Sequence, residues 1–438
     1  MMSVDSSSVT QLARATIGTS NSEQTEFCTG RRTYTHQFDE LYAQRLSALK
    51  PAVEQAAAQR WSKVKPTASV LNVDGSRATY VVGTLFIDSG NKPSTLHQVE
   101  NERWITDAHG TQYREAEDAL VYLEDESGRI RLTGDRIPSM ALASGIVAGV
   151  LGVETEKGDF EVADVCFAGM APQKMRPVFG EDRFVVLVSG LGATPEQPVT
   201  LAMQLLAEAL CGTLGASEMQ AKMARVAQVV LVGDTIHVPP APLGHADDAR
   251  ANDRAAVARL ASQVDDYLAD IAACMPLVVM PGARDPADTS LPQQPLPRGL
   301  FPRCAQYSGF STMTNPTTMQ LDGLQLLGSS GQNIEDLSRY SGEPAGKLAV
   351  ASLRWRHLAP TAPDTLWCYP FTTHDPFVLT SSPHVYFIGN QNRHEALWVQ
   401  GEDGQETRVV MIPRFCDTSQ VVLLNMRTLE CSTLDILS

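Results

Sequence analysis

Between residues 182 and 280 the chain alternates strand-sized apolar runs with helix-forming segments, and this alternation restricts the possible folds more than any other feature. The runs 184–190 (FVVLVSG) and 229–234 (VVLVGD) are almost wholly apolar and end at a turn with glycine, as is typical of strands buried on both faces. Residues 199–212 and 256–274 have apolar side chains at helical spacing, and each segment lies between two predicted strands. Such a chain is expected to fold as a layered α/β domain.

The pattern changes upstream, where short predicted strands follow one another over residues 80–167 with turn signals between them. A hairpin is expected to turn at residues 127–128. The layout predicts a small, five-stranded antiparallel barrel of the OB type. Before it, residues 38–49 form an amphipathic helix, which Pro51 is expected to bend or restart.

The chain is acidic, and its charge limits what it binds. It has 35 lysines and arginines against 50 aspartates and glutamates, a formal net charge of -15. Because nucleic-acid binding depends largely on cationic side chains that neutralise phosphates, strong independent binding to DNA is not expected. The eight cysteines are scattered without a CxxC pair, which indicates a reducing compartment and neither a disulfide framework nor a zinc site. No apolar run approaches the roughly 18 residues of a membrane span.

The loops that follow buried strands hold the active site in α/β sheets, so their residues decide the chemistry. They read SGLG (189–192), GDTIH (233–237), PGARDP (281–286) and GNQN (389–392). In order and placement they resemble the loops of calcineurin-like metallophosphoesterases, which supply D-x-H, G-D-x-x-D, G-N-H and G-H-x-H to two metal ions. The resemblance implies a phosphoesterase-like layered sandwich.

Most of the ligands for that chemistry are missing. Two metal ions that activate water need clustered carboxylates and imidazoles, whereas here the candidates are reduced to Asp234 and one nearby histidine, His237. An arginine, Arg284, would repel a dication. We therefore expect no catalytic residue, no metal and no cofactor at these loops. The degenerate positions are Ser189, Leu191, Asp234, Ala283, Arg284, Asn390 and Asn392.

Long, compositionally unusual strings carry a second resemblance. DPADTSLPQQPL (285–296) and APTAPDT (359–365) are the most specific of them, and the match is strongest over 276–391. The chain resembles the B-subunit family of replicative DNA polymerases, and its delta-type members above all. In that family the eukaryotic members have lost the metal ligands, which the archaeal members keep.

The resemblance implies an OB barrel packed on an inactive phosphoesterase-like α/β sandwich, with a short helical segment before the barrel. It also implies a scaffold that binds the C-terminal cysteine-rich domain of the polymerase catalytic subunit and a further regulatory subunit, in the nucleus. DNA is expected to bind only weakly or indirectly, and no membrane is expected to bind. The expected domains are a flexible tail over 1–27, a helical segment over 28–65, an OB-fold domain over 66–178 and an inactive phosphoesterase-like domain over 179–438.

Two other functions remain open from the residues alone. An active metal-dependent phosphoesterase or nuclease would need carboxylates clustered around Asp234. A module that binds single-stranded DNA would need a basic, aromatic groove on the barrel, for example with Arg129 and Arg131.

Three other side chains and one polar stretch could be taken for functional features, but a structural role is expected for each of them. Cys368 and Cys416 have no Cys-His-acid signature around them and are expected to be buried structural cysteines. His357 is expected to be a satisfied core or surface histidine. The polar stretch 245–255 is interpreted as an exposed loop.

Overall fold

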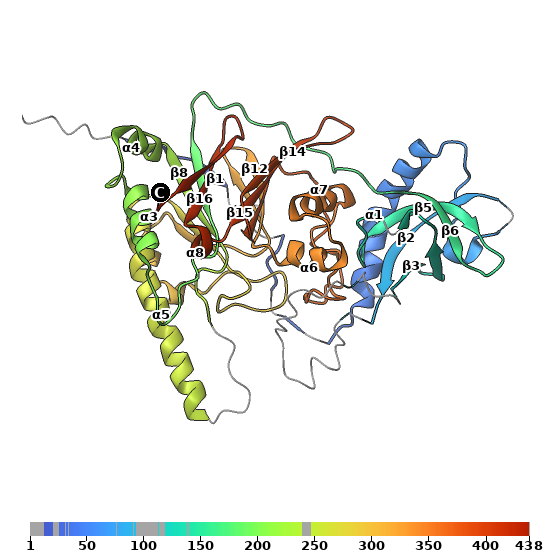
Figure 1. The fold of residues 1–438 in the computed structure, drawn as a ribbon, viewed down its shortest axis with the longest axis horizontal. Coiled ribbons are helices and arrows are strands. Elements are labelled where there is room, and N and C mark those ends of the chain that lie inside the picture. The colour runs from blue at the N-terminus through green and yellow to red at the C-terminus, as the bar shows by residue number, and fades with distance from the viewer. Residues whose placement is uncertain are drawn as a thin grey trace, which may run out of the picture.

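The protein is arranged in layers, which the computed structural model shows from one side to the other in Figure 1. A layer of helices covers one sheet, a second sheet packs against the first, and two further helices separate the second sheet from a barrel. No helix among the described residues is both long and apolar enough to cross a bilayer. The described residues are 13–20, 26–30, 32–33, 35–75, 77–90, 92, 113, 119–137, 140–238 and 247–437.

The barrel is closed and has the strand order β2-β3-β4-β6-β5. All neighbours are antiparallel except β4 and β6, whose parallel pairing closes the barrel. Alternate residues point inward, as the two-residue period of a strand requires, so Val81, Leu85 and Ile87 of one strand are all buried. The five strands are β2 (Thr79–Asp88), β3 (Leu120–Asp125), β4 (Gly128–Thr133), β5 (Val147–Glu154) and β6 (Phe160–Cys166).

Helix α1 (Asp39–Arg60) lies against the outside of the barrel and continues through Pro51. The helix is one element, so the expected restart at Pro51 is wrong, whereas the alternative, a bend at Pro51, stays a prediction. Leu46 before the proline and Val53 after it both pack in the same apolar cluster with barrel residues such as Tyr80. This shared burial offsets the hydrogen bond that the proline removes.

The first sheet has the order β10-β9-β8-β7-β16-β17, with β7 to β10 parallel. Both of its faces are buried: Val186 and Val188 point toward the helical layer, whereas Val185 and Leu187 point toward the second sheet. This explains why the run is apolar at every position. The strands are β7 (Phe184–Val188), β8 (Val226–Val232), β9 (Leu277–Met280), β10 (Phe310–Thr312), β16 (Gln420–Asn425) and β17 (Cys431–Asp435).

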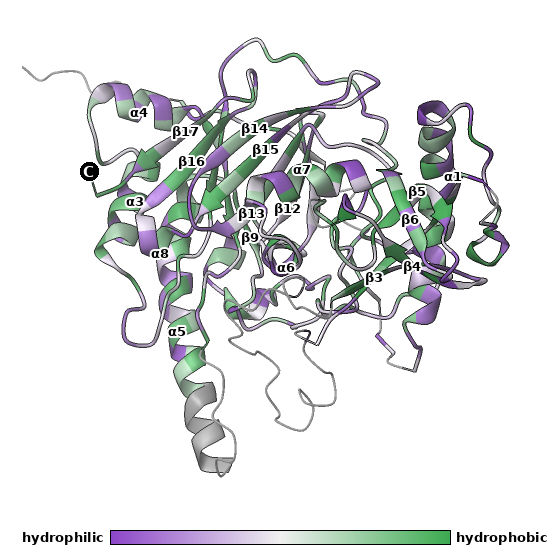
Figure 2. Cartoon of the chain, turned by 45° about the vertical axis from the view of Figure 1, so that its right-hand side comes forward, coloured by the Kyte–Doolittle hydropathy of each residue, from purple (hydrophilic) through white to green (hydrophobic). Residues whose placement is uncertain are grey.

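The second sheet has the order β1-β11-β12-β13-β15-β14. Its inner face, with Val385 and Phe387, packs on the first sheet, and its outer face, with Tyr386 and Ile388, belongs to the cluster that continues into the barrel. Both sheets are largely green, that is apolar, in Figure 2. The strands are β1 (Thr19–Ser20), β11 (Thr317–Leu321), β12 (Leu324–Ser329), β13 (Val385–Gln391), β14 (Glu395–Gln400) and β15 (Glu406–Pro413).

The helices divide between the two outer faces of the sheet pair. In the described part of the chain, some cover the first sheet, others lie between the second sheet and the barrel, and a short one follows β15. The 3-10 turns are η1 (Val70–Asn72), η3 (Arg298–Leu300) and η4 (Cys304–Gln306). The helices are α3 (Leu201–Cys211), α4 (Ser217–Ala224), α5 (Asp247–Cys274), α6 (Gln332–Tyr340), α7 (Ala345–Trp355) and α8 (Phe415–Thr418).

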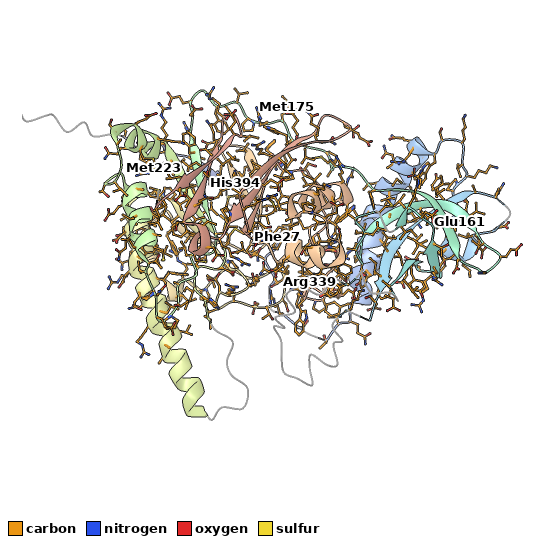
Figure 3. The ribbon with its side chains drawn as sticks, viewed as in Figure 1. Phe27, Glu161, Met175, Met223, Arg339 and His394 are labelled. Carbon is orange, nitrogen blue, oxygen red and sulfur yellow. The ribbon has the colours of Figure 1, made fainter. Side chains whose placement is uncertain are left out.

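The structure corrects two sequence expectations. The stretch 245–255 is not a loop from residue 247 onward, because α5 begins at Asp247; residues 245–246 lie outside the described residues. The tail 1–27 is not free where it is described. Its β1 adds an antiparallel strand to the second sheet, and Phe27, labelled near the centre of Figure 3, is only 2% exposed.

Candidate functional site at the carboxyl ends of the strands

The four loops chosen from the sequence meet at one edge of the paired sheets. β7, β8 and β9 are parallel, so the loops that follow them emerge side by side. The Gly190 amide donates to the Gly233 carbonyl at 2.9 Å, and the Gly192 amide donates to the Asp234 carbonyl at 3.0 Å. Asn390, near the end of β13 in the other sheet, joins them through its backbone amide, which donates to Ser189 Oγ. The topology therefore places these loops where a phosphoesterase would hold its metals.

Ser189 and Asn390 bond to each other in this site. The Asn390 amide donates to Ser189 Oγ at 2.9 Å, and Ser189 Oγ in turn lies 3.0 Å from the Pro413 carbonyl oxygen, to which it donates. The Asn390 side-chain Nδ2 donates to the Ser330 carbonyl at 2.9 Å. Leu191 is 2% exposed and packs in the apolar cluster of the helical layer. These residues are engaged in holding the loops together.

Asp234 is the one carboxylate that the sequence retained at an expected ligand position. It is 6% exposed, and its Oδ1 accepts a hydrogen bond of 2.9 Å from the Arg284 amide. Burial raises the pKa of Asp234, although the backbone bond and the nearby basic side chains of Arg284, Arg414 and His237 act in the opposite direction. Its φ of 55° lies in the left-handed region, which is uncommon for a residue with a side chain.

Asp285 is a buried carboxylate at this site that the sequence reasoning did not single out. Its two oxygens accept hydrogen bonds from the Ile236 amide at 2.7 Å and the Gly282 amide at 2.8 Å, so it joins the loops after β8 and β9. Burial, and then the charge of Asp234, raises the pKa of Asp285 to about 7. The signal available in the sequence was an aspartate directly after PGAR, where a buried strand has just ended.

The remaining expected positions supply neither a carboxylate nor an imidazole, although Arg284 lies beside Asp234. Ala283 and Asn392 are exposed, and Arg284 is half-buried. Within the described part of the chain, no three histidine, cysteine, aspartate or glutamate side chains are grouped so that they could hold a metal ion. With Leu191 in a core and cations beside Asp234, the donor set does not fit a two-metal centre.

The barrel presents a limited aromatic and basic face. Tyr122 of β3 is the register partner of Phe86 on one side and of Arg131 on the other. The Arg129 guanidinium lies 5.0 Å from the centre of the Tyr122 ring, and its Nη1 lies 3.9 Å from Glu124 Oε1. The aromatic and basic groups required for stacking on single strands are thus present, with an acidic side chain among them.

Three other side chains were considered as possible catalytic groups, and none of them has an activated thiol or imidazole. His357 is 1% exposed and hydrogen-bonds through Nε2 to Asp375 at 2.9 Å, which makes it the satisfied core histidine that was expected. Cys368 is buried, and burial raises its pKa to about 12. Cys416 is exposed, so its expected burial is wrong; its pKa is nevertheless raised to about 11, first by partial burial of the thiol and then by Asp417.

Comparison with known proteins agrees with this architecture. The family described as DNA polymerase delta subunit OB-fold domain matches residues 37–165, which include the barrel. The family described as the B subunit of DNA polymerases alpha and epsilon matches residues 185–396, from the first sheet into the second. The fold, together with these two matches, thus defines a B subunit of a replicative DNA polymerase.

Individual relatives narrow this class. The DNA polymerase delta small subunit of Oryza sativa is 39% identical over 418 residues, covering 95% of this chain and 96% of the rice protein. The DNA polymerase delta subunit 2 of Drosophila melanogaster is 35% identical, covering 91% of this chain and 93% of the fly protein. The DNA polymerase II small subunit of Pyrococcus abyssi is 21% identical, covering 73% of this chain and 51% of the archaeal protein. The chain belongs to the family of DNA polymerase delta small subunits. It is therefore a protein of DNA replication.

Proposed function

We propose that this chain is a non-catalytic scaffold of the DNA polymerase delta holoenzyme. In this proposal it binds the C-terminal cysteine-rich domain of the catalytic subunit and a further regulatory subunit, acts in the nucleus, and neither transfers nucleotides nor hydrolyses phosphoesters. Its identity to polymerase delta small subunits over nearly the whole chain supports the accessory role. DNA and membranes are not direct partners in this proposal.

The contact between Ser189 and Asn390 is the observation that carries the inactive assignment. At a metal centre built like that of a phosphoesterase, these positions would be occupied by ligands with free lone pairs. Here the Asn390 amide donates to Ser189 Oγ, and the Asn390 side chain donates to Ser330. A neutral amide and a hydroxyl, with no clustered carboxylates and imidazoles around them among the described residues, do not form the ligand set that two dications require. The proposal therefore treats the C-terminal domain as a phosphoesterase-like sandwich whose site has become structural.

The family-specific string around LPQQPL supports a structural use of the same region. Gln293 Nε2 donates to the Gly282 and Asp288 carbonyls, which fixes the loop after β9. Gln294 Nε2 donates to the Phe27 carbonyl at 3.0 Å, and so holds the N-terminal segment. These hydrogen bonds give both glutamines a role in folding, so the LPQQPL string needs no catalytic role to explain it.

A scaffold requires its parts to move as one body, and the shared core supports this. Leu85 of the barrel, Leu41 of α1 and Trp355 of α7 belong to one continuous apolar cluster. We propose that the chain divides into a helical segment (28–65), an OB-fold domain (66–178) and a phosphoesterase-like domain (179–438), which this cluster joins.

Co-expression tests the proposal. The chain is produced with the isolated C-terminal domain of a polymerase delta catalytic subunit, purified by size exclusion, and assayed for manganese-dependent phosphodiesterase activity. We expect a stable one-to-one complex without hydrolysis above background. Hydrolysis that disappears in Asp234→Ala but persists in Asn392→Ala, an exposed control, would show instead that the chain is an active phosphoesterase. Failure to form the complex would contradict the scaffold role independently of the enzymatic result.

A further inference from the structure

Two cysteines end neighbouring helices of the outer layer. Cys211 is the last residue of α3 and Cys274 is the last residue of α5, and the two helices pack against each other. The Cys211 thiol lies 3.6 Å from the Asp270 carbonyl oxygen, one helical turn before Cys274. The side chains of Cys211 and Cys274, called the thiol pair below, thus lie at the same end of adjacent helices, and each is free.

An arginine from the N-terminal segment lies beside the thiol pair. Arg14 Nη2 donates to the Leu210 carbonyl at 2.9 Å, and its Nη1 donates to the Met223 carbonyl at 3.2 Å and lies 3.7 Å from Met275 Sδ. Leu210 precedes one cysteine of the pair and Met275 follows the other. The cation therefore sits at the carboxyl ends of three helices, where the helix dipoles favour positive charge. Met223, the α4 contact, is labelled in Figure 3.

We propose that the thiol pair is a site of reversible oxidation, at which a hydroperoxide converts the two thiols into a disulfide that joins α3 to α5. Cys274 is exposed and is the cysteine that meets the oxidant first. Cys211 is half-buried and follows as the resolving thiol. The arrangement meets the requirement that a redox-sensitive cysteine be accessible and have a second cysteine beside it.

The electrons and atoms balance in two steps. The Cys274 thiol gives up its proton as its sulfur attacks one oxygen of hydrogen peroxide, the O–O bond breaks, and the proton joins the departing hydroxide, so that a sulfenic acid and one water are formed. The Cys211 sulfur then attacks the sulfenic sulfur, and its proton leaves with the displaced hydroxyl as a second water. Two thiols have lost two electrons to the peroxide. A dithiol reductant reverses the reaction by thiol–disulfide exchange.

The surroundings assign different parts to the two thiols. Burial first, and then the neighbouring Cys274, raises the pKa of Cys211 to about 12, so this residue stays protonated until the sulfenic acid has formed. The Arg14 charge acts the other way and favours a thiolate. Arg14 is therefore a positioning residue in this proposal: it holds the two helix ends together and stabilises the negative charge that develops on sulfur.

Mapping of the disulfide tests the site. The full-length protein is treated with limiting hydrogen peroxide, its remaining thiols are alkylated, and it is digested without reduction for mass spectrometry. We expect a peptide that links Cys211 to Cys274 within one chain and disappears after dithiothreitol. Cys274→Ser removes the link, whereas Cys416→Ser, a change at an exposed cysteine elsewhere, leaves it intact. Sulfinic acid at Cys274 without a link, or a link only between chains that grows with protein concentration, would overturn the proposal.

Thermal unfolding and rate measurements give an independent readout. Peroxide should raise the Tm of the wild-type protein by a few degrees, because the new bond restricts the unfolded chain, and should leave the Tm of Cys211→Ser unchanged. Arg14→Gln should slow disulfide formation by about threefold to tenfold, and Arg14→Lys, which keeps the charge, should restore most of the rate. Equal rates in all three proteins would remove Arg14 from the proposal, and an unchanged wild-type Tm would count against the disulfide.

Discussion

The Arg45 guanidinium of α1 donates a hydrogen bond of 2.7 Å from Nε to Asp375 Oδ2, and both side chains are completely buried. Its other nitrogens donate to three carbonyl oxygens: those of Gly145, at the barrel, and of Pro360 and Ala362, in the C-terminal half. One side chain thus connects the helical segment, the barrel and the C-terminal α/β region. Each of these hydrogen-bond partners is separated from Arg45 by at least 100 residues in the sequence.

Arg45→Met should strongly destabilise the protein. The change leaves the Asp375 charge buried with fewer partners and three carbonyls without a donor, so we expect a loss of about 3–5 kcal/mol in the free energy of unfolding. Urea denaturation measures it. Arg60→Met is the matched control in the same helix, because its ion pair with Asp164 is 56% exposed on the arginine side and should cost less than about 1 kcal/mol. Similar losses in both variants would contradict the assigned role of Arg45.

Stability should fall as the pH is lowered from 7 toward 4, because of His357. Burial first, and then Arg45, lowers the pKa of His357 to about 4 from an ordinary value of 6.5. In this window the unfolded chain takes up a proton that the folded protein refuses, so acid favours unfolding. Although burial alone would raise it, Arg45 and His357 hold the pKa of Asp375 below its usual range, so further stability is lost at still lower pH.

The variant His357→Gln isolates this effect. Glutamine keeps a donor for Asp375 but does not titrate, so the wild-type protein should lose about 3 kcal/mol more than the variant between pH 7 and pH 4. Urea unfolding at several pH values measures the difference. His374→Gln, at an exposed histidine beside Asp375, should keep the wild-type slope. Identical slopes for wild type and His357→Gln would show that His357 does not set the acid response.

Asp285 should change the pH dependence of stability in the direction opposite to that of His357. Its pKa is raised to about 7, so the folded protein holds a proton that the unfolded chain releases above about pH 4, and stability from this group declines as the pH rises from 4 to 7. Asp285→Asn should therefore make the rise of stability with pH steeper over that range. The variant also loses one carboxylate acceptor for a backbone amide, which lowers stability at every pH by about 1–3 kcal/mol. An unchanged slope would contradict the raised pKa.

Much of the fold could be predicted from local pattern because the strands obey simple burial rules. The stretch 184–188 is apolar throughout since both faces of β7 are covered. The hairpin between β3 and β4 could also be predicted, although its turn lies at residues 126–127, one residue before the expected 127–128. The meeting of Ser189 and Asn390 could be expected only from the resemblance to the phosphoesterase loops, because β7 and β13 belong to different sheets.

Other features could not be predicted because they depend on contacts far along the chain. In the sequence, Arg45 is a polar residue on an amphipathic helix, and nothing local indicates that it is buried beside Asp375. The first turns of α5 are polar and have no apolar period, so the sequence favoured a loop there. β1 is only two residues long and is held by β11, some 300 residues away.

The barrel face should contribute little to DNA binding. Arg129→Ala combined with Arg131→Ala should change the affinity for a single-stranded oligonucleotide by less than about threefold, because the chain is acidic and Glu124 lies beside Arg129. Fluorescence anisotropy at low and moderate salt measures this. A loss of tenfold or more, together with a shallower dependence on salt, would favour the single-strand-binding function over a purely structural barrel.

Asn390 and Asn392, the two residues of the GNQN loop that stand in place of histidines, should respond differently to substitution. Asn390 has a φ of 57°, and its side chain donates to the Ser330 carbonyl, so Asn390→Ala removes a partly buried hydrogen bond and places alanine in the left-handed region. We expect a loss of about 2–3 kcal/mol by urea denaturation.

Asn392 is exposed, so Asn392→Ala should stay within about 0.5 kcal/mol of the wild type. If both asparagines had been kept for residual metal binding, manganese would raise the Tm of the wild-type protein, and each variant would lose that rise. A manganese shift in the wild-type protein that either change abolished, with the stabilities otherwise equal, would contradict the structural role of this loop.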